Sequence, residues 1–218
     1  MTHFVLQTRF FLIRHAESEG NIAQKFQGRS DTPLSELGKR QALLLQKKLA
    51  NEKIDVVYYS PLVRARDTAQ IAFGSRHVPI IAENMLLARN FGPFDGLKLD
   101  EAKKFHPLAE ELYAGRISDI NLDGVESISS LQDRSLAAIK EISSKHQGQN
   151  VAMVTHLFWI KSLLSKILGI SFQDIRKMLP PTAWFVPAAS ITIADARLIN
   201  GTLQFDLKMI GDESYFSV

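Results

Sequence analysis

The sequence predicts an α/β fold in which helices cover both faces of a mostly parallel sheet. Short apolar runs rich in β-branched and aromatic residues alternate with stretches of helical period, as in parallel strands joined by crossover helices. Near the C-terminus, two strand-like runs flank Asn200-Gly201, a dipeptide suited to a type I′ turn. These observations predict a three-layer α/β/α sandwich with a C-terminal β-hairpin. No stretch resembles a linker, so we expect a single domain over residues 1–218.

Each predicted element depends on a local signal. Ser35 is placed to cap the first long helix, and Gly169 to end the last one. Ser129 and Gln132 have the spacing of a capping box, which predicts that Ser129 caps the helix before the fourth strand. In chain order, the predicted elements are strand 10–13, helix 35–51, strand 55–60, helix 61–73, strand 78–82, a helix over 99–112 that Pro107 interrupts, helix 129–146, strand 150–156, helix 157–168, and hairpin strands 190–199 and 202–210.

The composition is that of an ordinary globular protein. Hydrophobic residues make up 45% of the chain and charged residues 22%, and the net charge of +3 comes without a Lys/Arg run, so nucleic acid binding has little support. The absence of cysteine excludes disulfides, thiolate metal sites and a cysteine nucleophile. No apolar stretch approaches the roughly 20 residues of a membrane span, and residues 1–9 do not resemble a cleaved signal. We therefore expect a cytoplasmic protein; its oligomeric state stays open.

Three predicted strands end in cationic or imidazole side chains. Arg14 and His15 follow the first strand, and His156 ends the fourth. The second strand breaks at a Ser-Pro pair and is followed by Arg64, about one turn into the next helix. Because the carboxyl ends of parallel strands meet at one edge of a sheet, we expect these four side chains to lie together. A cluster of two Arg and two His suits a phosphate dianion, since guanidinium presents a planar fork to its oxygens.

Six short motifs follow one another along most of the chain. They are Leu12-Ile13-Arg14-His15-Ala16-Glu17-Ser18 with Asn21; Asp31-Thr32-Pro33-Leu34-Ser35 with Leu37-Gly38 and Gln41-Ala42; Ser60-Pro61-Leu62-Val63-Arg64-Ala65 with Thr68-Ala69; Phe91-Gly92 with Asp95-Gly96; Gly124-Val125-Glu126-Ser127; and Thr155-His156. In this order they resemble the histidine phosphatase superfamily, in the branch that includes the cofactor-dependent phosphoglycerate mutases. One Arg-His pair is weak evidence, whereas six motifs in sequence are strong.

The resemblance implies a metal-independent acid or broad-specificity phosphatase that hydrolyses phosphomonoesters through a phosphohistidine on His15. A neutral imidazole nitrogen can attack phosphorus if the other ring nitrogen is held, for instance by a backbone carbonyl. Arg14, Arg64 and His156 would stabilise the charge on the transferring phosphoryl group. The implied partner is a small phosphorylated substrate, with no cofactor and no metal. The implied substrate-binding residues are Asn21, Gln27, Gly28 and Leu157.

The sequence departs from the family at the proton donor. Members usually carry a Glu four residues before the Gly of the Phe-Gly pair, and here that position is Ala88. A methyl group cannot protonate a leaving oxygen. Three explanations stay open: the acid has been removed by substitution, Glu83 or Asp95 replaces it, or the chain has lost most of its activity. A second departure is the bulky segment Leu157 to Trp159 after His156, which either narrows the pocket, contacts the organic part of a substrate or packs in the core.

Two other functions compete with hydrolysis. A phosphoglycerate mutase would hold its phosphohistidine and return the phosphoryl group to a product, but such enzymes carry a longer insertion than residues 97–125 provide here. With little chain to close over the site, water should reach the phosphoenzyme, which favours hydrolysis. A phosphate-binding pseudoenzyme is supported by Ala88 and opposed by the intact Arg14, His15, Arg64 and His156.

Overall fold

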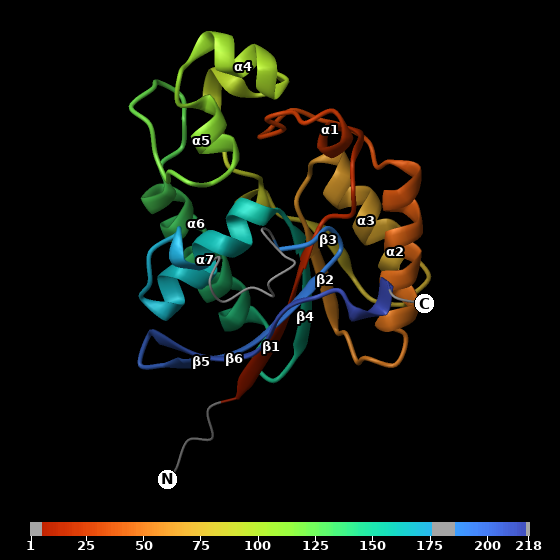
Figure 1. The fold of residues 1–218 in the computed structure, drawn as a ribbon. Coiled ribbons are helices and arrows are strands. Elements are labelled where there is room, and N and C mark those ends of the chain that lie inside the picture. The colour runs from red at the N-terminus through yellow and green to blue at the C-terminus, as the bar shows by residue number, and fades with distance from the viewer. Residues whose placement is uncertain (1–5, 176–185, 217–218) are drawn as a thin grey trace.

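The computed structural model describes residues 6–175 and 186–216, so part of the prediction about residues 1–9 lies outside the described residues. One six-stranded sheet has the order β3-β2-β4-β1-β5-β6 (Figure 1). The first four strands in this order pair in parallel, whereas β5 pairs antiparallel with both of its neighbours, β1 and β6. The strands are β1 (Gln7–Arg14), β2 (Val56–Tyr59), β3 (Ile80–Ala82), β4 (Asn150–Thr155), β5 (Ile191–Ile199) and β6 (Thr202–Asp212).

Helices pack on both faces of this sheet, which confirms the predicted three-layer architecture. Helices α2 and α3 lie on one side, and α6 and α7 on the other (Figure 1). The short helices α1, α4 and α5 lie near the end of the sheet at which the parallel strands terminate. The helices are α1 (Glu19–Ile22), α2 (Glu36–Lys48), α3 (Val63–Phe73), α4 (Leu99–Phe105), α5 (Ala109–Tyr113), α6 (Ile128–Lys145) and α7 (Leu157–Leu168), with 3-10 turns η1 (Asn84–Leu86), η2 (Gly92–Phe94) and η4 (Ser214–Phe216).

Strand β1 shows why the first apolar run has no polar member. Phe10 and Leu12 pack in the core cluster with α6 and α7, while Phe11 and Ile13 pack in the cluster with α2 and α3. Successive side chains of a strand point to opposite faces, so a strand covered on both faces must be apolar throughout. All four side chains are at most 1% exposed.

Several local predictions are confirmed. Ser35 caps α2, its Oγ accepting a hydrogen bond of 2.9 Å from the amide of Gly38. Gly169 ends α7 in the left-handed conformation, with φ of 64°. Asn200 and Gly201 join β5 to β6 with φ of 49° and 76°, as a type I′ turn requires at both central positions. Among the described residues, no helix is both long enough and apolar enough to span a membrane.

The predicted cap of α6 is wrong. The helix starts at Ile128 with Ser127 as its N-cap, whose Oγ accepts a 3.0 Å bond from the amide of Ser130. Gln132 does not reach back to the helix start, because its Nε2 donates to Ser165 on α7 at 2.8 Å. A contact outside the helix contributes to the earlier start: the amide of Ile128 donates to Asp119 Oδ1 at 2.7 Å.

Candidate active site

The ends of β1 and β4 and the first turn of α3 meet at one cavity. Arg14 lies opposite Thr155 in the parallel register, so the residues that follow, His15 and His156, are brought side by side with ring centroids 5.1 Å apart. Arg64 reaches the same place from α3. The cavity has a volume of about 330 Å³, and Arg14, His15, Arg64 and His156 all line it. The order of the strands therefore gathers the four side chains that the sequence places at strand ends.

His15 is held in one orientation and is kept neutral. Its Nδ1 lies 2.8 Å from the carbonyl oxygen of Ala16, to which it donates, so the lone pair is on Nε2. The side chain is buried, and this burial, followed by the charges of Arg64 and Arg14, lowers the pKa of His15 well below its ordinary value. A neutral imidazole with a fixed tautomer is the form that can act as a nucleophile.

Two arginines, the half-buried Arg14 and the buried Arg64, supply positive charge. Arg14 Nη1 donates to the carbonyl of Val186 at 2.7 Å, and Arg64 donates to the carbonyls of Gly28 and Ser30 at 2.7 and 2.9 Å. Burial lowers the pKa of each guanidinium to about 10, which leaves both charged at neutral pH. Because these backbone bonds fix the two groups before any ligand arrives, an anion meets charges that need no reorganisation.

His156 lies at the N-terminal end of α7. Its Nε2 is 2.8 Å from Ser60 Oγ, and its buried Nδ1 has no partner within residues 6–175 and 186–216. When Ser60 donates to Nε2, the imidazole proton is on Nδ1, and Nδ1–H can donate a hydrogen bond to an anion. Burial and the charge of Arg64 lower the pKa of His156 well below its ordinary value. Leu157, the first residue of α7, also lines the cavity, where the amides of a helix N-terminus favour negative charge.

The neutral residues predicted to bind substrate line the cavity as well. Asn21 Oδ1 accepts from the amide of Ser18 at 3.0 Å, and Gln27 Oε1 accepts from Thr32 Oγ1 at 2.6 Å. With their oxygens engaged, both side chains keep their NH₂ groups for a ligand. Gly28 has φ of +47°, and a Cβ there would lie 1.7 Å from a carboxylate oxygen of Asp95, so only glycine fits.

No Asp or Glu of the described residues lines the cavity. Ala88 does line it, with a side chain only 5% exposed. Glu83 accepts from the amide of Met85 at 2.9 Å and caps η1. Asp95 accepts from the amides of Arg29 and Phe91 at 2.9 and 3.0 Å, while burial raises its pKa. The structure thus places both alternative acids, Glu83 and Asp95, outside the cavity wall and in other hydrogen bonds.

Arg89 is a cavity residue that sequence reasoning missed. It is fully buried, its Nε donates to the carbonyl of Glu126 at 2.7 Å, and its Nη2 pairs with Asp119 at 3.1 Å. Its guanidinium carbon lies 5.2 and 5.7 Å from the ring centroids of Phe91 and Phe158. Burial lowers the pKa of Arg89 to about 10, so it remains charged at neutral pH. A single Arg in an irregular segment carries no local signal of burial, and only the folded contacts reveal it.

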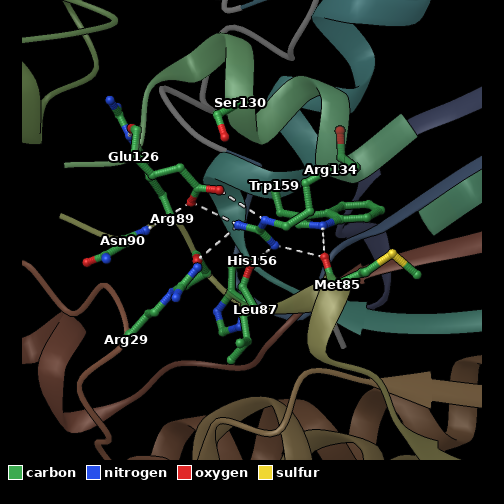
Figure 2. Close-up of polar contacts among 12 residues, drawn as sticks. Arg29, Met85, Leu87, Arg89, Asn90, Glu126, Ser130, Arg134, His156 and Trp159 are labelled. Carbon is green, nitrogen blue, oxygen red and sulfur yellow. Dashed lines mark hydrogen bonds and ion pairs between the residues drawn. The ribbon is translucent and has the colours of Figure 1, made fainter. Parts of the chain in front are cut away.

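A second arginine, Arg134 of α6, holds the chain segment that carries Ala88 (Figure 2). Its Nη1 donates to the carbonyls of Met85 and Leu87, both at 2.8 Å, and its Nη2 donates to the carbonyl of Ala88 at 3.3 Å. The guanidinium also forms a bidentate ion pair with Glu126, at 3.0 and 2.9 Å. Arg134 therefore fixes the backbone of residues 85–88 and, through it, this part of the cavity wall.

Arg134→Met is expected to lower the free energy of unfolding by about 3–5 kcal/mol, because it leaves Glu126 charged and without its main partner in a largely buried place. Urea unfolding measures this change. Arg116→Met is the matched control, since Arg116 pairs with Glu111 in an exposed ion pair whose loss should change the free energy of unfolding little. Equal losses in the two variants would contradict a structural role for Arg134.

Metal ligands do not gather in the part of the chain that the structure describes. No group of three or more His, Asp or Glu residues lies close enough there to hold an ion. Of the residues that the structure describes, the charged ones that line the cavity are Arg14, Arg64, Arg89 and Lys25. The arrangement is therefore that of a receptor for an anion with a neutral imidazole beside it.

Comparison with known proteins agrees with this geometry. The family model of the histidine phosphatase superfamily (branch 1) matches residues 10–194. Phosphoserine phosphatase 1 of Hydrogenobacter thermophilus is 31% identical over 165 residues, which are 76% of this chain and 78% of that protein. Phosphoglycerate mutase-like protein 4 of Arabidopsis thaliana is 35% identical over 171 residues, 77% of this chain and 74% of that protein.

A solved structure extends the similarity to nearly the whole chain. Bacillus stearothermophilus YhfR superposes with a TM-score of 0.82 at 28% identity, covering 96% of this chain and 100% of that one. The matched family segment begins in β1, before Arg14 and His15, and extends past His156 into β5. The protein described here therefore belongs to the histidine phosphatase superfamily, branch 1.

Proposed function

We propose that this protein hydrolyses phosphomonoesters through a phosphohistidine intermediate on His15, without a metal. One observation carries the proposal: a neutral imidazole, oriented by the carbonyl of Ala16, shares a cavity with the guanidinium groups of the half-buried Arg14 and the buried Arg64. This combination provides a nucleophile for phosphorus and fixed charge for the phosphoryl oxygens. The names of relatives, phosphoserine phosphatase among them, support a small phosphorylated substrate.

The reaction follows from these groups in two displacements. The Nε2 lone pair of His15 forms a bond to phosphorus while the bond from phosphorus to the leaving oxygen breaks, and that oxygen keeps the electron pair. Arg14, Arg64 and His156 stabilise the charge on the other phosphoryl oxygens. Water then attacks the phosphohistidine, the bond from phosphorus to nitrogen breaks, and inorganic phosphate leaves with His15 neutral again.

The balance of products tests hydrolysis against phosphoryl transfer. With 4-nitrophenyl phosphate as substrate and 3-phosphoglycerate present as a competing acceptor, we expect equal amounts of 4-nitrophenolate and inorganic phosphate. A shortfall of phosphate, matched by a bisphosphorylated product, would show that the phosphoenzyme donates to the acceptor, as a mutase does. His15→Ala serves as the background for non-enzymatic release.

In a plot of log kcat/KM against pH, the decline on the acidic side (the acidic limb) is expected to lie below pH 6.5. Only neutral His15 can attack, and its lowered pKa keeps it neutral until the pH falls below the ordinary value of 6.5. Activity should therefore persist through pH 6.5 and decline only as His15 takes up a proton at lower pH. The measurement is log kcat/KM against pH, corrected for ionisation of the substrate.

The variant Arg64→Met gives this pH experiment an internal check. Removing the Arg64 charge takes away the second-largest cause of the lowered pKa of His15, so the midpoint of the acidic limb should move to higher pH. A wild-type midpoint at or above pH 6.5, or a midpoint that does not move in Arg64→Met, would contradict the assignment of this limb to His15.

A further inference from the structure

We propose that the natural substrate is a phosphate monoester of an aromatic hydroxyl group, whose leaving oxygen departs as a phenolate without a proton from the enzyme. This inference rests on the proposed function and adds the class of leaving group to it. Two independent features of the cavity carry it: a continuous aromatic wall, and charged side chains that, among the described lining residues, are all cationic.

The aromatic wall consists of four rings that all line the cavity and contact one another in series. Phe158 packs edge-to-face on Phe91 with centroids 5.2 Å apart, and Phe91 packs in the same way on Phe26 at 5.2 Å. Phe26 in turn meets Tyr113 of α5 edge-to-face at 5.0 Å. Phe26 and Phe91 are buried and support the half-buried Phe158 and Tyr113, so the wall is pre-formed, and a planar aromatic group can pack on these two rings at little cost in entropy.

The charged side chains that line the cavity, among the described residues, all carry positive charge. Arg14, Arg64, Arg89 and Lys25 line it, and none of the Asp or Glu residues that the structure describes does so. The segments that the structure leaves out, 1–5, 176–185 and 217–218, contain no Asp or Glu in the sequence. Neither the described lining of the cavity nor these segments therefore offers an Asp or Glu side chain to protonate a leaving oxygen.

The chemistry of leaving groups connects the two features. A phenol has a pKa of about 10, as in tyrosine, so a phenolate departs readily with only electrostatic help. An aliphatic alkoxide is far more basic and depends on a general acid, whose contribution is typically about 10²- to 10⁴-fold. Fixed cations that line the cavity can stabilise a phenolate, and Arg89, although paired with Asp119, has its guanidinium carbon 5.2 and 5.7 Å from the Phe91 and Phe158 ring centroids. The same wall that binds an aromatic group thus faces charges suited to its departure.

Steady-state kinetics on a leaving-group series tests the proposal. The substrates are substituted phenyl phosphates of increasing phenol pKa, with phosphoserine and 3-phosphoglycerate as aliphatic esters. We expect kcat/KM to fall steeply as the phenol pKa rises, and the aliphatic esters to be at least about 10²-fold poorer than phenyl phosphate. Aliphatic esters turned over as well as phenyl phosphate would overturn the proposal, as would a flat dependence on phenol pKa.

Variants of the aromatic wall test separately whether the wall binds the aryl group of the substrate. Phe158→Leu is expected to raise KM for phenyl phosphate about tenfold, and to raise it much more than KM for phosphoserine, because it removes ring contacts to the aryl group that are made equally in the ground and transition states. Phe105→Leu is the control, since Phe105 is an exposed ring of α4 that does not line the cavity, and it should change neither. Equal effects of the two variants on KM would overturn the aromatic assignment.

One competing source of a proton shares the cavity. Tyr113 presents a phenolic hydroxyl there, and burial raises its pKa. If aliphatic esters prove to be good substrates and Tyr113→Phe removes that activity, Tyr113 is the general acid and the proposal is wrong. This failure is distinguishable from failure of the proposed function, because a phosphohistidine on His15 would still form. Absence of the phosphoenzyme with every substrate would instead remove the hydrolase mechanism itself.

Discussion

Replacing His15 with Ala is expected to lower kcat for phosphate release by about 10⁴- to 10⁶-fold, the loss typical of removing a covalent nucleophile. Among the described residues that line the cavity, no other side chain combines a neutral nitrogen with a tautomer fixed by a backbone carbonyl. His156, the nearest imidazole, is bound through Nε2 to Ser60 and is placed to donate rather than to attack. The measurement is steady-state phosphate release from phenyl phosphate.

The control for His15→Ala is binding of orthovanadate or inorganic phosphate followed by thermal unfolding. Arg14, Arg64 and His156 remain in the variant, so either anion should still raise its midpoint of unfolding. A variant that binds the anion but has lost turnover supports the role of nucleophile. A loss of less than tenfold in kcat would show that the phosphoryl group goes elsewhere.

The second large expected effect is a gain in turnover of aliphatic esters. Ala88→Glu is expected to raise kcat for an aliphatic ester such as phosphoserine by about 10²- to 10⁴-fold, while aryl esters change little. The new side chain would start from the cavity wall, on a backbone that Arg134 holds in place, and would bring a carboxylic acid to a cavity without Asp or Glu among its described lining residues. Only the poor leaving group needs that proton.

Ala88→Gln separates proton donation from a change of shape. Glutamine has nearly the same size as glutamic acid and carries no acidic proton, so it should leave phosphoserine turnover at the level of the unaltered chain. The comparison is made with both esters, in the same buffer. If the Glu and Gln variants behave alike, position 88 does not serve as a site for a general acid in this fold.

Much of the architecture could be predicted from the sequence because the signals are local. The uninterrupted apolar run of β1 reflects burial on both faces, and Asn200-Gly201 fixes a hairpin through its two positive φ angles. The cluster of Arg14, His15, Arg64 and His156 was also predictable, since it needs only parallel strands that end at the same edge.

The contacts that shape the rest of the cavity could not be predicted in this way. Arg89 and Arg134 join segments that lie far apart in the chain, and their partners are largely backbone carbonyls, which every sequence possesses. The cap of α6 was misplaced for a related reason. Serines occur at 127, 129 and 130, and tertiary contacts such as the bond from the Ile128 amide to Asp119 take part in fixing where the helix starts.

The measurement that tests the central claim most directly is rapid-quench trapping of the phosphoenzyme. The protein is mixed with a phenyl phosphate labelled on phosphorus and quenched in alkali, in which phosphohistidine survives, and the labelled peptide is then identified by mass spectrometry. We predict label on His15, formed and lost at rates consistent with kcat, and no label in His15→Ala. Rapid turnover without any labelled peptide, or label on His156 instead, would contradict the account.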